Sequence, residues 1–341
     1  MAPVNCDIDF DTASLAGKTA VVTGGASGLG KAYVQALVAA KAFVCFGDKD
    51  IPSGKKLADE LPNTKFVECD VTKWSDQTHL FREAASFSPS GRIHYVVANA
   101  GIISKDPVFS FGNHNAHCRD TAVIHLGADC TLVIVANGSL EDDIESAEPN
   151  LSVIDVNLGG VLFTVKLSMH YFVKQNGTEA SDSQEDTCLV LASSGAGYLD
   201  CPRGPQYSAT KWAIRGIMHS MRRTAFYYGS RVNIVAPWRT KGVITNGSRY
   251  VRTEILSKAD FDQVETTGVQ FATTEDAGQC LLRILSDSSI NGRSLFVSAR
   301  KWAPRGYLDL DLDDYDGNDL VQEIQSDQIK PAPVELGLFQ S

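Results

Sequence analysis

The chain has 341 residues, of which 43% are hydrophobic and 21% charged, proportions typical of a soluble globular protein that buries a core. This length fits one large domain or two ordinary ones. The formal net charge of -10 disfavours nucleic acid or an anionic membrane surface as a partner, because there is no surplus of basic side chains to neutralise phosphates.

The cysteines and the first residues bear on the compartment. Eight cysteines are scattered along the chain without a C-x-x-C pair, a pattern that favours a reducing compartment. Residues 1–17 are polar and acidic and lack the apolar core of a secretory signal, and no run of 18 apolar residues occurs. We therefore expect a cytoplasmic protein that does not bind a membrane.

Taken in chain order, short apolar runs rich in β-branched residues alternate with segments of helical period. The runs predict strands at residues 19–23, 43–47, 65–69, 94–98, 188–192, 232–236 and 294–298. The segments between them predict helices at residues 31–42, 53–61, 75–86, 152–175, 208–228 and 275–285. This alternation predicts an α/β doubly wound Rossmann fold, in which a seven-stranded parallel sheet is covered on both faces within a single domain.

Two regions interrupt the alternation. An insert near residues 109–140 is interpreted as a lid, an interface element or sequence that packs poorly. The segment 303–341 is acidic, which is typical of a solvated or loosely ordered tail without chemistry of its own; it carries Asp309, Asp311, Asp313, Asp314, Asp316 and Asp319. We therefore expect an N-terminal extension at 1–15, a Rossmann domain at 16–302 and an acidic tail at 303–341.

The insert also contains residue types that bind zinc, namely His114, His117 and Cys118, with Cys130 following. Their spacing matches no structural zinc site. We interpret this stretch as a polar loop and expect no metal.

A glycine-rich run follows the first predicted strand and opens the first helix; it reads Thr23-Gly24-Gly25-Ala26-Ser27-Gly28-Leu29-Gly30. Glycines there permit a tight turn and let the backbone approach a pyrophosphate, whose charge the N-terminus of the following helix stabilises. Taken alone, the run is a weak signal, because an ordinary strand-to-helix turn can also contain such glycines.

An acidic residue favours the dinucleotide interpretation. Asp48 ends the second predicted strand, where a carboxylate can hydrogen-bond the ribose hydroxyls of adenosine and disfavours a 2′-phosphate. This position indicates NAD as the cofactor. NADP stays possible, because Lys31 and Lys49 are close in the sequence.

Residues at two later strand ends support the prediction of a cofactor site. Asp70 and Val71 end the third predicted strand, and Asn99-Ala100-Gly101 ends the fourth. Ligands of open parallel sheets bind beyond the carboxyl ends of the strands, so these turns are expected to meet the glycine loop in one crevice.

Tyr207 and Lys211 are four residues apart and therefore share one face of a helix. A neighbouring ammonium lowers the pKa of a phenol, whose ordinary value is about 10, and makes Tyr207 a credible general acid/base. Ser194 follows a predicted strand and can place its hydroxyl on the substrate oxygen, although a serine in such a loop is often a turn residue.

In this order the residues resemble the short-chain dehydrogenase/reductase family over about residues 16–300. The resemblance implies that Tyr207 transfers the proton, Lys211 lowers its pKa and holds the nicotinamide ribose, and Ser194 orients the substrate oxygen. It also implies that Asn157 supports a water in a proton relay, whereas Asn157 by itself would be a mid-helix residue bonding its own backbone. The implied cofactor-binding set is Gly24, Ser27, Gly28, Leu29, Gly30, Asp48, Asp70, Val71, Asn99, Ala100, Gly101, Tyr207, Lys211, Pro237 and Thr240.

The sequence departs from the family pattern after the sixth strand. Trp238 follows Pro237 where the family usually has glycine, and it either narrows the pocket or packs in the core. Gly242 stands where a threonine is usual, so Thr240 or Thr245 is expected to contact the carboxamide instead.

The resemblance implies hydride transfer between a nicotinamide and a carbon bearing oxygen, which interconverts a secondary alcohol and a ketone. A weaker similarity to fungal hydroxyprostaglandin dehydrogenase-like members suggests a fairly large apolar substrate, such as a terpenoid, a steroid-like compound or a polyketide, lined by residues 195–206 and 240–271. A homodimer or homotetramer is expected through the helices at 152–175 and 208–228. The alternative is a non-redox protein on the same fold, either an isomerase or cyclase or a cofactor-binding regulator.

Overall fold

The computed structural model describes residues 3–103, 123–125, 131–133, 149–202, 204–238, 240–241, 266 and 268–337. The chain divides into two units, Met1–Ser104 with Leu151–Ser341, and Lys105–Asn150. In the second unit the described residues form a small antiparallel pair, β5 (Val123–His125) and β6 (Thr131–Val133). The other residues of the expected insert, including the histidines and cysteines of the polar loop, lie outside the described residues.

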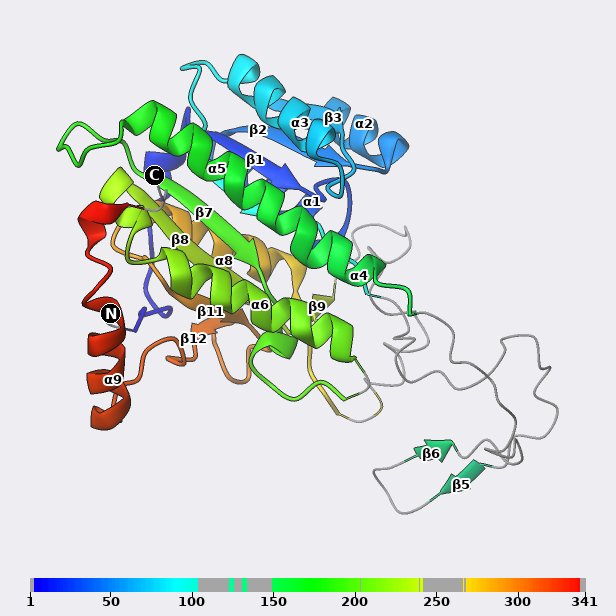
Figure 1. The fold of residues 1–341 in the computed structure, drawn as a ribbon. Helices are drawn as coiled ribbons and strands as arrows, with labels where there is room; N and C mark the ends of the chain where they lie inside the picture. Colours follow the sequence, from blue (N-terminus) through cyan, green and yellow to red (C-terminus); the bar gives the residue numbers. More distant parts are fainter. Residues whose placement is uncertain are drawn as a thin grey trace. The chain divides into compact units, whose positions relative to one another are not determined.

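The first unit is built on an eight-stranded sheet in the order β12-β11-β8-β7-β4-β1-β2-β3 (Figure 1). Seven of these strands are parallel, as the sequence predicted: β1 (Thr19–Thr23), β2 (Phe43–Asp48), β3 (Thr64–Glu68), β4 (Tyr95–Ala98), β7 (Thr187–Ala192), β8 (Ser230–Pro237) and β11 (Ser294–Val297). The strand order reverses direction between β1 and β4, and a sheet of this kind opens a crevice at such a switch point.

Helices cover both faces of the sheet. On one face lie α1 (Gly28–Ala39), α2 (Ile51–Glu60) and α8 (Thr274–Ser286), and on the other α3 (Trp74–Phe87), α5 (Gly160–Asn176) and α6 (Pro205–Met221) (Figure 1). Each layer closes its own apolar core against the sheet. All six residues of β7 are buried, which explains its continuous apolar sequence in place of an alternating one.

The remaining described elements lie between or beyond these helices and strands. They are η1 (Ala13–Leu15), α4 (Ser152–Ile154), η3 (Asp155–Gly159), η4 (Gly195–Gly197), η5 (Ala225–Tyr228), β9 (Thr240–Lys241), β10 (Ala272–Thr273), β12 (Tyr307–Asp309), α9 (Asp319–Ile329) and η6 (Val334–Leu336). The start of α8 is fixed by a capping box, in which Thr273 Oγ1 accepts from the Asp276 N–H at 3.1 Å and Asp276 accepts from the Thr273 N–H at 2.9 Å.

Among the described helices, the stretch Ser152–Asn176 is long and apolar enough to cross a membrane by length and composition. Its α5 part packs against β4 and β7 and buries Val161, Leu167 and Phe172 in the core. Core helices of soluble proteins share this composition, because they too bury an apolar face.

The acidic C-terminal segment differs from its expected form as a solvated tail. β12 pairs antiparallel with β11 and adds an eighth strand to the sheet beyond residue 302. Arg293, which is 1% exposed, binds Asp309 at 2.8 Å, Asp311 at 2.8 Å and Asp314 at 2.9 Å. These carboxylates are therefore partners of a buried guanidinium, whose charge would otherwise be costly to bury.

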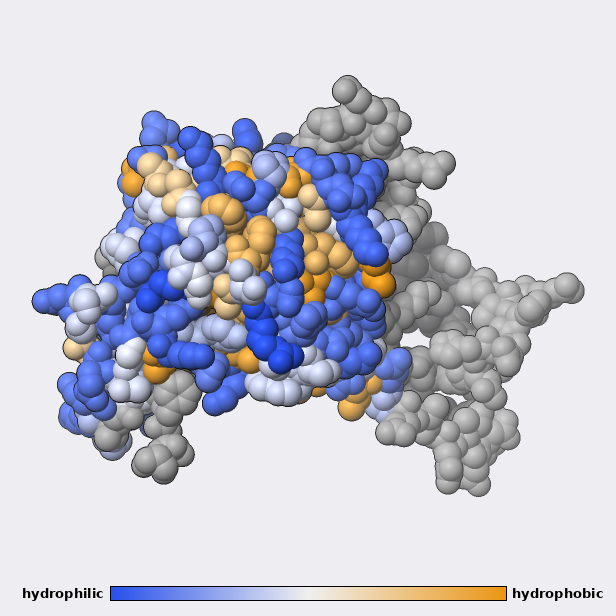
Figure 2. Space-filling model, turned by 90° about the horizontal axis from the view of Figure 1, so that it is seen from above, coloured by the Kyte–Doolittle hydropathy of each residue, from blue (hydrophilic) through white to orange (hydrophobic). Residues whose placement is uncertain are grey.

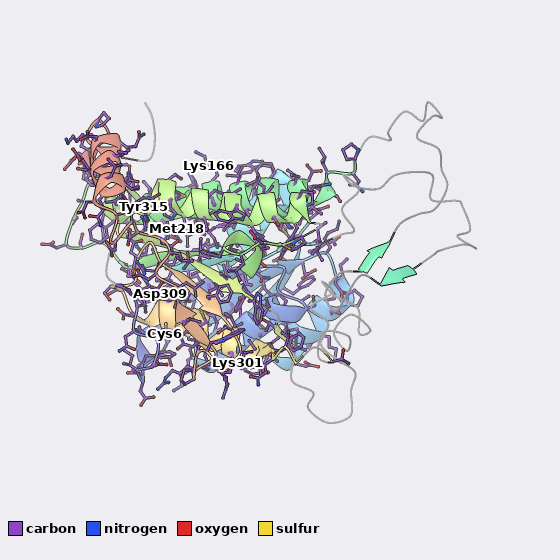
Figure 3. All side chains as sticks on the ribbon, turned by 90° about the horizontal axis from the view of Figure 1, so that it is seen from below. Cys6, Lys166, Met218, Lys301, Asp309 and Tyr315 are labelled. Atoms are coloured by element: carbon purple, nitrogen blue, oxygen red, sulfur yellow. The ribbon has the colours of Figure 1, made fainter. Side chains whose placement is uncertain are left out.

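The first residues of the chain meet the same segment. The Val4 N–H donates to Asp309 Oδ2 at 2.9 Å, and Figure 3 shows Cys6 near Asp309. Only the last part of the tail fits the solvated form, since α9 buries none of its residues.

Candidate active site

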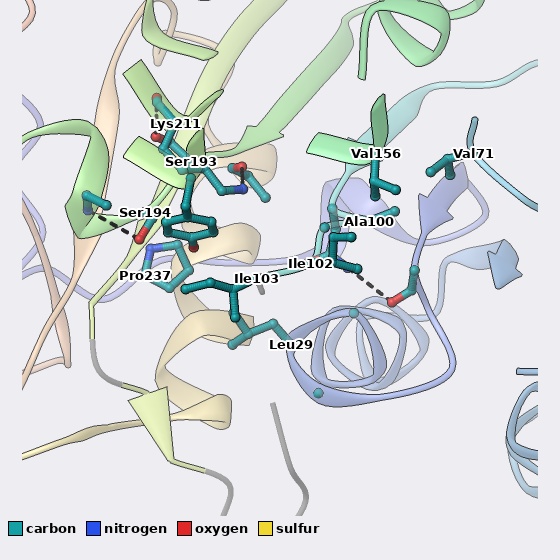
Figure 4. A pocket seen from close by; sticks show the side chains of 18 of the residues that line it. Leu29, Val71, Ala100, Ile102, Ile103, Val156, Ser193, Ser194, Lys211 and Pro237 are labelled. Carbon is teal, nitrogen blue, oxygen red and sulfur yellow. Dashed lines mark hydrogen bonds between the residues drawn. The ribbon is translucent and has the colours of Figure 1, made fainter. Parts of the chain in front are cut away.

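A cleft of about 1340 Å³ lies beyond the carboxyl ends of the parallel strands. Every residue that the sequence predicted for the cofactor lines it, from Gly24 in the glycine loop to Thr240 in β9. Ser194, Tyr207 and Lys211 line it as well, whereas Asn157 is fully buried behind its wall. In the close view, Ser194, Lys211 and Pro237 gather on one side, and Val71 and Val156 lie on the other (Figure 4).

The glycine loop between β1 and α1 leaves no room for a side chain at Gly24 or Gly30. Gly24 has φ +68°, and a Cβ there would lie 2.8 Å from Ala100 Cα. A Cβ on Gly30 would overlap the carbonyl oxygen of Gly24. Ser27, the N-cap of α1, makes no side-chain cap to the helix, so among the described residues the first-turn N–H groups keep their capacity to bind an anion.

Asp48 holds the loop from the next strand. Its Oδ2 accepts from the Ala26 N–H at 3.0 Å, and its Oδ1 accepts from the Asp50 N–H at 3.0 Å. Each oxygen retains a second lone pair for a ligand hydroxyl, because a carboxylate offers about four acceptor positions. The side chain therefore shapes the loop and still lines the cleft.

Asp70 is fixed by its neighbours at the end of β3. Its Oδ1 accepts from the Thr72 hydroxyl at 2.7 Å, and its Oδ2 lies 3.3 Å from Lys49 Nζ. Burial raises the pKa of Asp70, but the hydrogen bonds from Thr72 and the charge of Lys49 outweigh it, and the net pKa lies below its usual value. Thr72 also lines the cleft and was missed from the sequence, although an Asp-x-Thr turn after a strand is a recognisable signal.

Thr23 is a second residue that the sequence analysis did not assign. Its hydroxyl accepts from the N–H groups of Asn99 at 3.1 Å and Ala100 at 3.2 Å. Asn99 returns the contact by donating from Nδ2 to the carbonyl oxygens of Thr23 at 3.0 Å and Gly24 at 3.1 Å. These hydrogen bonds join the ends of β1 and β4 at the cleft. The feature of the sequence that could have indicated this role is the threonine directly before the glycines.

Asn157 lies in the π-helical turn η3, a distortion that is frequent at functional sites. Taken alone in the sequence, Asn157 was expected to bond the backbone of its own helix, but its side chain bonds Ile102 instead. Its Oδ1 accepts from the Ile102 N–H and its Nδ2 donates to the Ile102 carbonyl oxygen, both at 2.8 Å. This reciprocal pair anchors the segment after β4, which carries Gly101 and Ile102 into the cleft wall.

Tyr207 and Lys211 lie on α6, beside the strand end that carries Ser194. Lys211 Nζ donates to the Ala192 carbonyl oxygen at 3.0 Å and lies 5.5 Å from the centroid of the Tyr207 ring. Ser193 Oγ donates to the carbonyl oxygen of Lys211 at 2.9 Å and ties β7 to α6. Both strand-end serines line the cleft, but the Ser193 hydroxyl is bonded to α6, whereas the Ser194 hydroxyl accepts from the Ala196 N–H at 3.3 Å.

The pKa values of the pair follow from burial. Burial raises the pKa of Tyr207, against the opposing effect of a hydrogen bond with Ser194. Burial also lowers the pKa of Lys211 to about 8. The direction for Tyr207 differs from the expected lowering by Lys211, because the sequence shows the neighbouring ammonium but not that both groups leave water.

The far wall is formed after β8 by Pro237, Trp238 and Thr240. Thr240 is 6% exposed, and its hydroxyl has no hydrogen-bond partner among the described residues. A buried unpaired hydroxyl that lines a cleft is suited to a polar ligand group. Thr245, Gly242 and most of the expected substrate segment 240–271 lie outside the described residues.

No group of three or more His, Cys, Asp or Glu side chains is arranged to hold a metal ion within the part of the chain that the structure describes. The described cysteines are all free thiols. The polar groups that line the cleft are backbone N–H groups, the Tyr207 phenol, the Lys211 amine and several hydroxyls. Groups of these kinds can bind an organic cofactor and transfer protons.

Known proteins are similar to this chain in sequence and in fold. The family model for "short chain dehydrogenase" matches residues 18–126 and 131–251. The chain is 31% identical over 330 residues to 5'-hydroxyaverantin dehydrogenase of Dothistroma septosporum, with coverage of 93% of this chain and 94% of that protein. It is 28% identical over 316 residues to NADP-dependent dehydrogenase M3 of Phoma sp., with coverage of 91% and 83%.

A solved structure shares the fold. The 3-ketoacyl-(acyl-carrier-protein) reductase from Brucella melitensis, complexed with NADH, superposes with a TM-score of 0.59 at 19% identity, over 83% of this chain and 97% of that one. The sequence matches carry the family assignment, and the superposition carries the arrangement of strands and helices. The chain belongs to the short-chain dehydrogenase family and is an NAD(P)-dependent oxidoreductase that acts on alcohols and ketones.

Proposed function

We propose that this enzyme interconverts a secondary alcohol and a ketone on a fairly large, apolar secondary metabolite, with Tyr207 as general acid/base. The observation that carries the proposal is the meeting of Ser194, Tyr207 and Lys211 at one end of the cleft whose other end is the glycine loop. Apolar side chains also line this cleft, among them Ile103, Val156, Phe163, Leu199 and Trp238. Relatives named as hydroxyaverantin dehydrogenases act on a hydroxylated metabolite, which supports a substrate of the same general class.

The cleft fits a nicotinamide dinucleotide. The glycine loop and the N-terminus of α1 suit a pyrophosphate, and the unpaired hydroxyl of Thr240 suits the carboxamide. When bound, the nicotinamide ring accepts or donates the hydride. Asp48 would bind the adenosine ribose with the lone pairs that the backbone leaves unused.

The chain's own residues would manage the proton. Ser194 orients the substrate oxygen toward Tyr207, which takes the hydroxyl proton during oxidation and returns it during reduction. Burial raises the pKa of Tyr207, so the phenol is protonated at neutral pH and prepared to donate. Lys211 is held by Ala192 beside the tyrosine ring, from which position it favours the phenolate that forms when the proton leaves.

A deuterium-transfer experiment tests the redox assignment directly. The protein would be incubated with NAD⁺ and a panel of secondary alcohols that carry deuterium on the carbinol carbon. Mass spectrometry is expected to find deuterium in the reduced cofactor and a matching ketone. An isomerase, a cyclase or a binding regulator would leave the cofactor unlabelled across the panel, and that result would overturn the proposal.

We propose NAD as the preferred cofactor. Asp48 lines the cleft, and its carboxylate would repel the 2′-phosphate of NADP at the adenosine ribose, because like charges repel. Lys49 lies beside it, but its ammonium is already paired with Asp70. Titration with NADH and NADPH is expected to give tighter binding of NADH, whereas a clear preference for NADPH would reject this role of Asp48.

The proposed assembly is a soluble, cytoplasmic homodimer or homotetramer. Its α5 and α6 surfaces carry exposed apolar side chains, with Leu162 at 47% and Trp212 at 49% exposure. A band of apolar residues crosses the mostly hydrophilic face seen in Figure 2. Light scattering on purified protein is expected to give at least twice the monomer mass of 36.9 kDa.

A further inference from the structure

An indole ring occupies the wall of the cleft beside the serine loop. Trp238 follows Pro237 at the end of β8 and lines the cleft together with Ser194 and Gly195. A Cβ on Gly195 would lie only 2.6 Å from Trp238 Cδ1, so the ring packs directly on the backbone of that glycine. The residue next to the catalytic serine is therefore in contact with the indole.

A second tryptophan supports the ring. The centroids of Trp238 and Trp302 are 5.1 Å apart at an interplanar angle of 57°, a favourable aromatic arrangement. Trp302 is 53% exposed and has Lys301 Nζ 4.2 Å above its ring. Gly195 and Trp302 thus fix the position of the indole, while the backbone N–H of Trp238 is bound to Val297 at 2.9 Å.

The surroundings of this ring are apolar. Leu199, which is 47% exposed, and Ile103 line the same cleft. The indole therefore lies in the wall beside Ser194, where a substrate held by Ser194 and Tyr207 would be its neighbour. A flat aromatic ring can pair with an indole, whereas a saturated ring of the same carbon number is thicker and gains no ring-to-ring attraction.

We propose that Trp238, supported by Trp302, is a specificity-determining residue that selects secondary alcohols and ketones with a flat aromatic ring. The preference holds against saturated substrates of the same skeleton. This inference rests on the proposed function, because it names the substrate class of the same site.

A matched pair of small probes tests the selection. 2-Tetralol and 2-decalol have the same bicyclic carbon skeleton and a secondary hydroxyl at the same position, and differ in whether one ring is aromatic. With NAD⁺ in excess, the wild-type protein is expected to favour 2-tetralol by about tenfold in kcat/KM.

Variants of the indole locate the source of that preference. Trp238→Leu keeps an apolar side chain and is expected to reduce the preference to about twofold, mainly through the 2-tetralol value, while Trp238→Phe keeps most of it. Trp302→Leu is expected to give an intermediate preference, because it loosens the support without removing the ring. Phe226→Leu is the control, since Phe226 is 66% exposed and does not line the cleft.

The outcomes separate this inference from the proposed function. Equal kcat/KM values for the two alcohols in wild type, or an unchanged preference in Trp238→Leu, overturn the inference while oxidation itself upholds the proposed function. If neither alcohol is oxidised, calorimetric binding of 2-tetralone and 2-decalone to the protein with NADH decides. Tighter binding of 2-tetralone that depends on Trp238 supports the inference, and equal binding overturns it. If Trp238→Leu does not fold, Trp238→Phe and Trp302→Leu are judged by the same two measurements.

Discussion

The two ends of the cleft are formed by different kinds of groups. The nucleotide end consists of backbone and close glycine contacts, with Gly30 against the carbonyl oxygen of Gly24 and Asn99 bonded to the same loop. The catalytic end consists of buried side chains that titrate, Tyr207 and Lys211. The first end is therefore sensitive to added volume, and the second to a changed charge or a lost proton. Substitutions that act on one end and leave the other intact would establish this division.

The largest effect is expected from removing the phenolic hydroxyl. Tyr207→Phe deletes the proton-transferring group and changes little volume, so kcat should fall by about a thousandfold or more. The dissociation constant of NADH, measured by fluorescence titration, should stay within about threefold of wild type, because the glycine loop is unchanged. A large loss of NADH affinity would show that the two ends are not separable.

Added volume at the other end should have the opposite pattern. Gly30→Ala forces the loop away from Gly24, and the NADH dissociation constant should rise at least about tenfold. Gly216→Ala on α6 is the matched control, because its new Cβ meets nothing within 4 Å. That control should bind NADH normally and gain about 0.5–1 kcal/mol in the free energy of unfolding. An unchanged NADH dissociation constant in Gly30→Ala would mean that the loop can shift to accommodate the added methyl group at little cost.

Asp48 is a charged side chain at the nucleotide end, which otherwise consists of backbone and glycines. It therefore tests whether a change of charge also affects that end. Asp48→Asn keeps an oxygen that can accept from the Ala26 N–H but removes the negative charge. The ratio of NADPH to NADH affinity should therefore rise about tenfold, with NADH binding itself little changed. Asp48→Ala should weaken both cofactors, because the loop loses its acceptor. An unchanged ratio in the asparagine variant would assign Asp48 to loop structure alone.

The smallest effect concerns stability and pH at the catalytic end. The pKa of Lys211 is about 8 in the folded protein and about 10.4 in an unfolded chain. Between these values the unfolded chain binds more protons, so this lysine makes the free energy of unfolding rise with pH. Urea unfolding of wild type and Lys211→Met should show wild type gaining on the variant from pH 8 to 10. A gap that stays constant over this range would indicate an ordinary pKa for Lys211.

The sequence predicted the parallel sheet and many of the residues that line the cleft, the sheet from local patterns and the residues from strand ends together with the family resemblance. Apolar runs locate the strands, and strand ends of a parallel sheet meet at one edge. The roles assigned to those residues stay predictions until the variants are measured. The eighth strand was not predicted, since the run Tyr307–Asp309 is short and lies among acidic residues.

Contacts between residues that are far apart in the sequence could not be predicted from such local patterns. Arg222 and Asp314 pair at 2.9 Å across 92 residues, and Asn157 binds Ile102 across 55. Nothing local distinguishes Asp314 from a solvated carboxylate, and nothing local shows that Lys211 is buried. The acidic tail and the pKa of Tyr207 were therefore the two points at which structure and sequence reading differed most.

The antiparallel strand β12 makes one border of the sheet a short strand of three residues that ends in Asp309. An uncovered strand presents a row of unpaired N–H and C=O groups to which another chain can add, which is a route to aggregation. β12 covers β11 at one border of the sheet, and β3 at the other border carries the charged side chains Lys65 and Glu68. A chain shortened to residue 302 would uncover β11 and leave Arg293 without its carboxylates, so it should aggregate before its cleft can be assayed.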